Sequence, residues 1–219
     1  MVPVRPGDTT MTDGVESGAK AGRKIGVFGG TFDPPHIGHL VAAVDAKEAL
    51  GLDVVLMVVA DVPWQKVDSR RVTPSHHRLA MTVAAVGDRE GIEASDIEIG
   101  RGGPTYTVDT LAELLVADAT AELFVILGRD AAGGFTSWER YREVAEMASL
   151  VVVDRPGPPL ELDRRFDWTR VDTPEIDVSS SDLRRRVADG RSIDYLTPAA
   201  VVDYIVEAGL YRDTPGLYR

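Results

Sequence analysis

Two histidines three positions apart, His36 and His39, are the side chains of this chain best suited to binding an anion. They follow a short apolar run, in a stretch that begins at Gly29 and holds two adjacent glycines and two adjacent prolines. Glycine lets the backbone approach a ligand closely, and proline stiffens the loop. Imidazole N–H groups, together with the N–H groups at the start of a helix, suit a polyphosphate. The stretch from Gly29 to His39 therefore predicts a phosphate-binding loop.

Four short apolar runs, rich in β-branched residues, indicate the elements that position this loop. Continuous runs of this kind are typical of strands buried on both faces, and hence of a parallel sheet. Because helical patterns alternate with them, the sequence predicts an α/β fold with a doubly wound parallel sheet. Ligands in such sheets bind beyond the carboxyl ends of the strands. The predicted strands are Ile25–Phe28, Val54–Ala60, Leu123–Leu127 and Leu150–Val153.

Four helices are predicted from apolar residues at a spacing of three and four. Thr73-Pro74 and Thr197-Pro198 predict the starts of the second and fourth helices, and Gly209 predicts the end of the fourth. The residues predicted to face the core are Leu40, Ala43 and Val44; Leu79, Val83 and Val86; Val108, Leu111, Ala112 and Leu115; and Val201, Tyr204, Ile205 and Ala208.

The ends of the chain differ in composition from the part between them. Residues 1–22 are rich in Gly, Thr, Ser and Asp without periodicity and are expected to form a disordered N-terminal tail. Residues 23–211 are expected to form one domain, whose helical C-terminal part begins at about residue 179. Residues 212–219 are expected to form a second tail.

Charge and cysteine content narrow the classes of function. The formal net charge is -11, which opposes binding to nucleic acid or to an anionic membrane. The chain has no cysteine, so a thiol nucleophile, a disulfide framework and a thiolate metal site are all excluded. No apolar run approaches the ~18 residues that span a bilayer. A soluble cytoplasmic protein is expected, possibly a homo-oligomer, because the sequence leaves the oligomeric state open.

Polar residues follow two other predicted strands. Lys66 lies in the loop after the second strand, where it is a candidate phosphate partner. Gly128 and Asp130 follow the third strand, and a carboxylate there can accept both hydroxyls of a ribose. These residues predict that the ligand beside the histidines is a nucleotide.

The stretch GGTFDPPHIGH closely resembles the signature of the bacterial nicotinate-nucleotide adenylyltransferases, a family of the HxGH nucleotidyltransferase superfamily. The resemblance extends from residue 24 to about 211. Later segments that support it are Gly102–Leu111, Leu127–Asp130, Ser137-Trp138 and Ile176–Arg186. The chain departs from the family pattern at Trp64-Gln65, where the family more often has Pro-His before the lysine.

The resemblance implies a Rossmann-like nucleotidyltransferase fold with a small C-terminal helical subdomain. It also implies transfer of AMP from ATP to nicotinate mononucleotide, by in-line attack without a covalent intermediate, giving deamido-NAD and pyrophosphate. Mg²⁺ would accompany ATP, held mainly by phosphates and water. No metal site formed by protein side chains is expected, and Asp33 is at most an outer-shell ligand.

The resemblance also implies roles for particular residues. The ring of Trp138 would stack on the pyridine, and Tyr106 and Thr107, at a helix start, suit the nicotinate carboxylate. Arg184 suits pyrophosphate by bidentate hydrogen bonding. The expected catalytic residues are His36, His39, Arg184 and Lys66. The expected ATP-binding residues are Gly29, Gly30, Thr31, Phe32, His36, Gly38, His39, Gly128, Asp130, Ser180, Ser181 and Arg184. The expected mononucleotide-binding residues are Asp33, Lys66, Tyr106, Thr107 and Trp138.

Several alternatives stay open on the sequence. Another adenylyltransferase of the superfamily would use phosphopantetheine or an alcohol phosphate, and nicotinamide mononucleotide could replace nicotinate mononucleotide as acceptor. A catalytically silent protein that senses ATP or NAD is the alternative from a different class. A dehydrogenase is disfavoured because the residues after the first strand do not fit G-x-G-x-x-G.

Overall fold

The computed structural model describes residues 22–62, 72–154 and 161–212 and contains a six-stranded parallel sheet. The strands lie side by side in the order β3-β2-β1-β4-β5-β6, and all neighbouring pairs run parallel. The predicted doubly wound α/β fold is therefore confirmed. The strands are β1 (Lys24–Gly30), β2 (Val54–Val59), β3 (Ile92–Ser95), β4 (Glu122–Gly128), β5 (Ser149–Asp154) and β6 (Trp168–Asp172).

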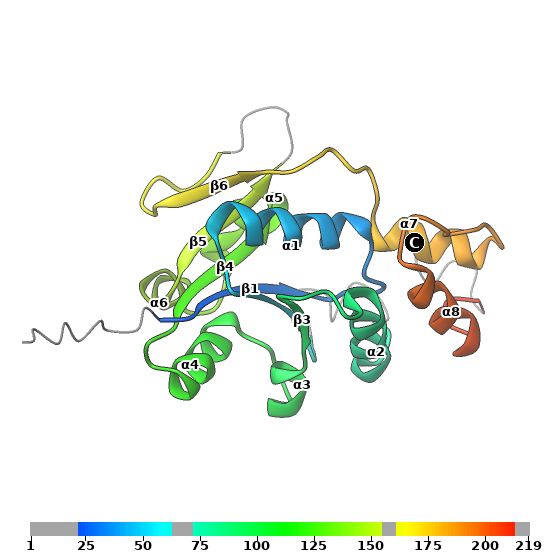
Figure 1. The fold of residues 1–219 in the computed structure, drawn as a ribbon, viewed down its shortest axis with the longest axis horizontal. Coiled ribbons are helices and arrows are strands. Elements are labelled where there is room, and N and C mark those ends of the chain that lie inside the picture. The colour runs from blue at the N-terminus through cyan, green and yellow to red at the C-terminus, as the bar shows by residue number, and fades with distance from the viewer. Residues whose placement is uncertain (1–21, 63–71, 155–160, 213–219) are drawn as a thin grey trace, which may run out of the picture.

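Helices cover both faces of this sheet (Figure 1). Helix α1 lies on one face, whereas α3 and α4 lie on the other. The helices are α1 (Ile37–Leu50), α2 (Ser75–Val86), α3 (Ile97–Arg101), α4 (Thr107–Ala117), α5 (Arg129–Gly133), α6 (Tyr141–Met147), α7 (Ser180–Ala188) and α8 (Ala199–Glu207), with a 3₁₀ turn, η2, at Phe135–Ser137.

Alternate residues of the central strands enter different cores, because successive side chains of a strand point to opposite faces. Val27 of β1 packs with Val108 and Leu111 of α4, whereas its neighbour Phe28 packs with Ala43 of α1. Both faces of the central strands are therefore buried, which explains the continuous apolar runs in the sequence.

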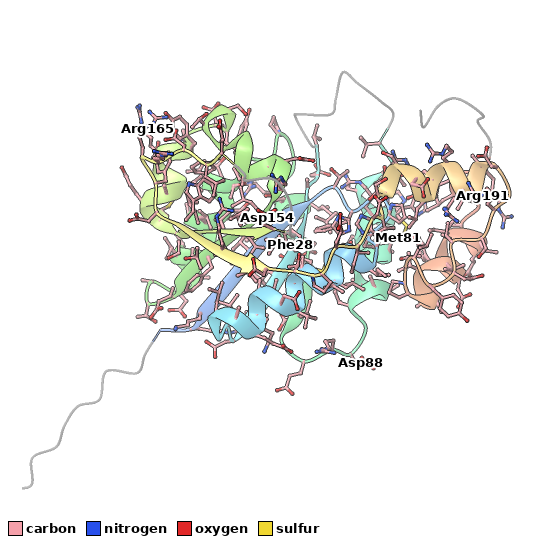
Figure 2. All side chains as sticks on the ribbon, turned by 90° about the horizontal axis from the view of Figure 1, so that it is seen from above. Phe28, Met81, Asp88, Asp154, Arg165 and Arg191 are labelled. Carbon is pink, nitrogen blue, oxygen red and sulfur yellow. The ribbon has the colours of Figure 1, made fainter. Side chains whose placement is uncertain are left out.

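A third core lies where the C-terminal helices pack against α2. It includes Met81 of α2, Leu183 of α7, and Val201 and Ile205 of α8. Figure 2 shows Met81 beside these helices, at the end of the molecule away from Arg165. This arrangement places the start of α7 next to the loop between β1 and α1.

The predicted helix starts need small corrections. Helices α2 and α8 begin one residue after Pro74 and Pro198, which occupy the N-cap positions in place of the predicted threonines. Thr197 instead donates its hydroxyl hydrogen to the carbonyl of Pro35 at 2.8 Å. Three residues predicted to face the core, Val83, Ala112 and Ala208, are exposed. The two short strands β3 and β6 were not predicted.

Candidate active site

The loop between β1 and α1 forms one wall of a large cavity. The cavity has a volume of 650 Å³ and lies at the carboxyl ends of the strands. Residues from β1, α1, β4, β5 and the segment before α7 meet there. The predicted ATP-binding residues that line it are Gly29, Gly30, Thr31, Phe32, His36, Gly38, His39, Gly128, Asp130, Ser180 and Ser181.

The two histidines stack face to face at this cavity. Their ring centroids are 3.6 Å apart with an interplanar angle of 20°. The backbone N–H of His36 donates to Nδ1 of His39 at 3.2 Å. Because Nδ1 of His39 accepts this hydrogen bond, the proton of the neutral ring lies on Nε2, which can then donate to a ligand in the cavity.

Burial makes His36 a neutral donor rather than a cation in the free protein. Loss of hydration lowers its pKa to about 4. In the unfolded chain the pKa would be about 6.5, so between these values the unfolded chain binds more protons. Stability contributed by this difference is present above pH 6.5 and is lost as the pH falls toward 4.

We therefore expect acid to destabilise the wild type more than His36→Gln. Between pH 7 and pH 5 the difference in free energy of unfolding should be about 2 kcal/mol, from a pKa change of this size. Urea unfolding of both proteins at the two pH values measures it. An equal loss of stability in both proteins would show that the His36 pKa is not lowered.

The carbonyl groups of the loop accept hydrogen bonds from neighbouring segments of the protein. The carbonyl of Gly30 accepts from the Ala60 N–H at 3.0 Å. That of Thr31 accepts from Arg78 at 3.0 Å, and that of Asp33 from Arg184 at 2.6 Å. The carbonyls of Pro34 and Pro35 accept from the hydroxyls of Ser180 and Thr197, each at 2.8 Å.

This pattern orients the amide groups of the loop. In a trans peptide unit the N–H points opposite to the C=O. Since the Thr31 carbonyl points to Arg78, which does not line the cavity, the N–H of Phe32 points away from Arg78. Phe32 itself lines the cavity. A backbone N–H that faces a cavity suits a phosphate oxygen.

Arg184, predicted to bind pyrophosphate, lies behind the loop. Its side chain is 1% exposed and is not among the residues that line the cavity. It donates to the Asp33 carbonyl and, at 3.0 Å, to the hydroxyl of Ser181. In this structure Arg184 positions the loop and α7, and its contact with pyrophosphate remains a prediction.

The carboxylate of Asp33 is held by protein groups on both oxygens. One accepts from the hydroxyl of Tyr211 at 2.7 Å, and the other from the N–H of Thr73 at 3.3 Å. The side chain is 1% exposed. These two hydrogen bonds make Asp33 an anchor of the loop. Its predicted contact with the mononucleotide is untested.

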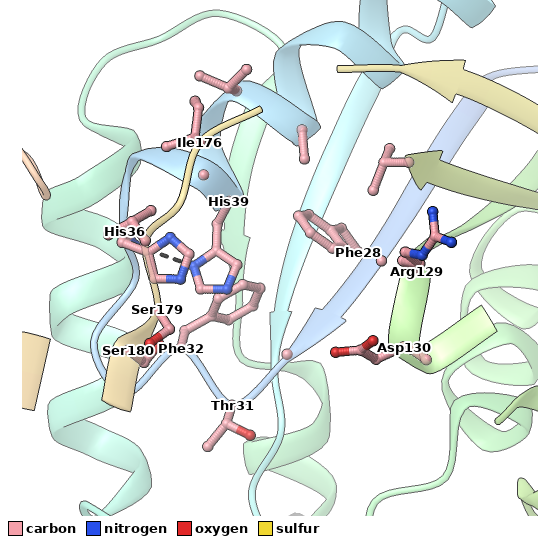
Figure 3. A pocket seen from close by; sticks show the side chains of 18 of the residues that line it. Phe28, Thr31, Phe32, His36, His39, Arg129, Asp130, Ile176, Ser179 and Ser180 are labelled. Carbon is pink, nitrogen blue, oxygen red and sulfur yellow. Dashed lines mark hydrogen bonds between the residues drawn. The ribbon is translucent and has the colours of Figure 1, made fainter. Parts of the chain in front are cut away.

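The far wall of the cavity carries Asp130 and Arg129. Figure 3 shows both across the cavity from the histidine pair, with Thr31 at its lower edge. Arg129 donates to the carboxylate of Asp154 at 2.9 Å, and Asp154 is buried at the end of β5. Sequence reasoning placed Asp130 here but missed Arg129, although it directly follows Gly128 at the carboxyl end of β4.

A second, smaller cavity of 60 Å³ lies on the side of the sheet covered by α3 and α4. Thr107 and Trp138, both predicted to bind the mononucleotide, line it together with Glu98. Gly29 and Gly128 line both cavities. A Cβ added to either glycine would meet nothing within 4 Å. Ala131 lines both cavities as well, so the two cavities approach each other at two glycines and one small side chain.

Glu98 was not predicted as a site residue. It accepts from the hydroxyl of Thr110 at 2.8 Å, and burial is the main cause that raises its pKa. Prediction of β3 would have revealed it, because Glu98 lies three residues beyond that strand.

Tyr106 occupies the N-cap position of α4 and packs against the core without lining either cavity. Lys66 and Trp64 lie outside the described residues.

A nucleotide-sized cavity with a histidine pair and a carboxylate lies at the switch between β1 and β4, where doubly wound sheets bind nucleotides, and this arrangement fits a nucleotidyltransferase. The model of the cytidylyltransferase-like family matches residues 27–186. The chain belongs to the family of bacterial nicotinate-nucleotide adenylyltransferases. Two relatives named probable nicotinate-nucleotide adenylyltransferase show this.

The relative from Thermus thermophilus is 45% identical over 189 residues, which cover 86% of this chain and 100% of the relative. The relative from Mycolicibacterium smegmatis is 41% identical over 197 residues, covering 86% of this chain and 92% of the relative. The solved structure of Plasmodium falciparum nicotinic acid mononucleotide adenylyltransferase, complexed with NaAD, has a TM-score of 0.71. It is 19% identical and covers 88% of this chain and 98% of that one, and it supports the fold.

No helix in the described part of the chain is long and apolar enough to cross a membrane.

Proposed function

We propose that this protein transfers AMP from ATP to nicotinate mononucleotide and releases pyrophosphate and deamido-NAD. The observation that carries the proposal is a pair of cavities that share Gly29 and Gly128 in their walls. One cavity is large enough for a nucleoside triphosphate, and the other holds the predicted pyridine-binding residues. The names of the relatives at 41% and 45% identity support the same acceptor.

In the proposed complex, ATP binds in the large cavity with its triphosphate at one end and its base at the other. The triphosphate lies along the loop and the histidine pair, and the ribose hydroxyls lie at Asp130. The base occupies the apolar part of the cavity beside Phe28 and Val153, where Arg129 stands at the wall. The α-phosphate is then near the two glycines that also line the smaller cavity.

The acceptor enters from the opposite side. Its pyridine ring stacks on Trp138, and its carboxylate lies at the N-terminus of α4 near Thr107, where backbone N–H groups favour an anion. The small cavity has room for only part of a mononucleotide. The ribose and 5′-phosphate of the acceptor therefore lie outside it, over Gly29 and Gly128.

The reaction forms one P–O bond and breaks another. A 5′-phosphate oxygen of the mononucleotide attacks the α-phosphorus of ATP, and the bond to the bridging oxygen breaks in line, releasing pyrophosphate. The phosphate nucleophile is already ionised near pH 7, so no general base is required. Rate acceleration comes from positioning two anions and from donors aimed at the charge that develops on the phosphates. His39 and the amides of the loop supply these donors.

We propose that Mg²⁺ accompanies ATP and is held mainly by its phosphates and by water. Within the described ranges, no group of three His, Asp or Glu side chains could hold a metal ion. The oxygens of Asp33 are engaged by Tyr211 and Thr73. When bound to the phosphates, Mg²⁺ neutralises part of their charge. We propose that the reaction takes place in the cytoplasm.

Trp138→Ala should mainly weaken binding of the acceptor. Loss of the stacking surface, worth on the order of 1 kcal/mol or more, should raise KM for nicotinate mononucleotide about fivefold to tenfold. KM for ATP should stay within about twofold, because Trp138 does not line the larger cavity. Trp168, which packs against the same core but lines neither of these cavities, provides the matched control substitution. An unchanged KM for the mononucleotide would place the pyridine elsewhere.

One assay separates the proposed function from its alternatives. Pyrophosphate release from ATP is measured with nicotinate mononucleotide, nicotinamide mononucleotide, 4′-phosphopantetheine and glycerol 3-phosphate in turn. We expect the highest kcat/KM with nicotinate mononucleotide and deamido-NAD as the product. A higher kcat/KM with another acceptor would assign that acceptor, and no release with any of them, despite ATP binding, would favour a sensor.

A further inference from the structure

Arg78 of α2 is a buried arginine that sequence reasoning did not connect with the site. Its side chain is 1% exposed, and it ranks with Arg184 among the largest fully buried side chains. Its guanidinium donates to four backbone carbonyls. The distances are 2.7 Å to Thr73, 3.0 Å to Thr31, 2.5 Å to Ala60 and 2.8 Å to Asp61.

These carbonyls belong to three segments that meet at the carboxyl edge of the sheet. Thr31 lies in the cavity loop after β1, Ala60 and Asp61 follow β2, and Thr73 precedes α2. The planar fork of a guanidinium can bind several acceptors in fixed directions, whereas a lysine ammonium acts as a compact point charge. A single Arg78 side chain therefore fixes the loop relative to its neighbours.

Arg78 and Arg184 hold the loop at two points that flank Phe32. Arg78 binds the carbonyl of Thr31, and Arg184 binds that of Asp33. Between them Phe32 has a φ of 47°, in the left-handed region that is unfavourable for a residue with a side chain. Such a conformation persists only when its surroundings impose it. The two arginines provide those constraints.

The conformation of Phe32 decides where its N–H points. With the Thr31 carbonyl bound to Arg78, the N–H of Phe32 points away from the arginine. Phe32 lines the cavity, whereas Arg78 does not. We propose that Arg78 is a positioning residue for the triphosphate loop, which keeps this N–H aimed at a phosphate oxygen. The inference rests on the proposed function only in that the ligand of the loop is a polyphosphate.

Arg78→Lys tests the proposal, because it keeps the charge and loses the fork. Binding of inorganic tripolyphosphate and of adenosine is measured separately by calorimetry. We expect the Kd for tripolyphosphate to rise about tenfold or more, because a misplaced donor loses most of its value, while the Kd for adenosine changes less than about twofold. Arg140→Lys, an exposed arginine paired with Asp109 and Glu143, is the matched control and should change neither.

A merely structural role predicts a different result. General damage to the fold would weaken both ligands together and lower the melting temperature in proportion. That outcome, or an unchanged Kd for tripolyphosphate in a folded Arg78→Lys protein, would overturn the proposal.

A measurement on the wild type covers the case in which the variant does not fold. Addition of tripolyphosphate should shift the Phe32 amide signal in a ¹H–¹⁵N spectrum and protect that amide from hydrogen exchange. Adenosine should do neither. Absence of both effects at saturating tripolyphosphate would overturn the proposal. Failure of AMP transfer to nicotinate mononucleotide would instead contradict the proposed function and leave these binding results unaffected.

Discussion

His39→Ala should lower kcat about a hundredfold or more while the Kd for ATP changes little. Nδ1 of His39 accepts the backbone N–H of His36, so the proton of the neutral ring lies on Nε2, and His39 lines the cavity. Removal of one fixed donor to developing charge typically costs 10²–10³ in kcat, or about 3–4 kcal/mol. Ground-state binding depends on many other contacts and should fall much less. Steady-state kinetics with both substrates saturating, together with calorimetric ATP binding, measure the two quantities.

His77→Ala is the matched control for this substitution. His77 lies on α2, accepts or donates a hydrogen bond at 2.9 Å to the Tyr204 hydroxyl, and does not line the cavity. It should leave kcat within about twofold. If His39→Ala retained nearly normal kcat at saturating substrates, then the donor role of His39 would be wrong.

Gly29→Val should abolish most of kcat/KM without unfolding the protein. A Cβ at Gly29 would meet no heavy atom within 4 Å, because the space beside it is open to both cavities. The added side chain would occupy the region where the two phosphates meet. We expect a loss of a hundredfold or more in kcat/KM, since displacement of reacting atoms by about 1 Å already costs on the order of 10²-fold.

The control for Gly29→Val is a glycine that is also surrounded by open space but lies outside both cavities. Gly100 on α3 meets this condition, since an added Cβ again has no neighbour within 4 Å. Gly100→Val should leave kcat/KM almost unchanged. Both variants should show cooperative unfolding near the wild-type melting temperature. A Gly29→Val protein with normal kcat/KM would show that the phosphates do not meet at this glycine.

The central strands could be predicted from sequence because their physical environment is uniform. The middle residues of strands such as β1 and β5 are buried on both faces, so they form continuous apolar runs. The edge strands β3 and β6 were missed for the opposite reason. Only Val171 of β6 is buried, and β3 has four residues with one of them buried, so neither produces an apolar run.

Helix faces were harder to predict than helix positions. Val83 was expected in the core of α2 but is 54% exposed. The buried face of α2 instead holds Arg78, Met81, Thr82 and Ala85. An arginine in that face shifts the apparent apolar stripe, since a rule based on hydrophobicity assigns a charged side chain to solvent. Burial of Arg78 depends on carbonyls from three distant segments, which no local pattern reveals.

In the candidate site, too, the positions of residues along the chain could be predicted, whereas their contacts could not. The residues of the loop and Asp130 could be placed at one cavity because each follows a predicted strand. The sequence also predicted Arg184 at this site, but it did not predict that the side chain lies behind the loop. The roles of Arg129 and Glu98 depend on contacts with Asp154 and Thr110, which come together only in the folded chain.

A crystal structure with a non-hydrolysable ATP analogue and nicotinate mononucleotide tests the account most directly. We expect phosphate oxygens within about 3 Å of Nε2 of His39 and of the Phe32 N–H, and the α-phosphorus facing the acceptor phosphate across Gly29. The pyridine ring should stack on Trp138. Phosphates bound away from the loop, or both ligands on the same side of Gly29 and Gly128, would contradict the account.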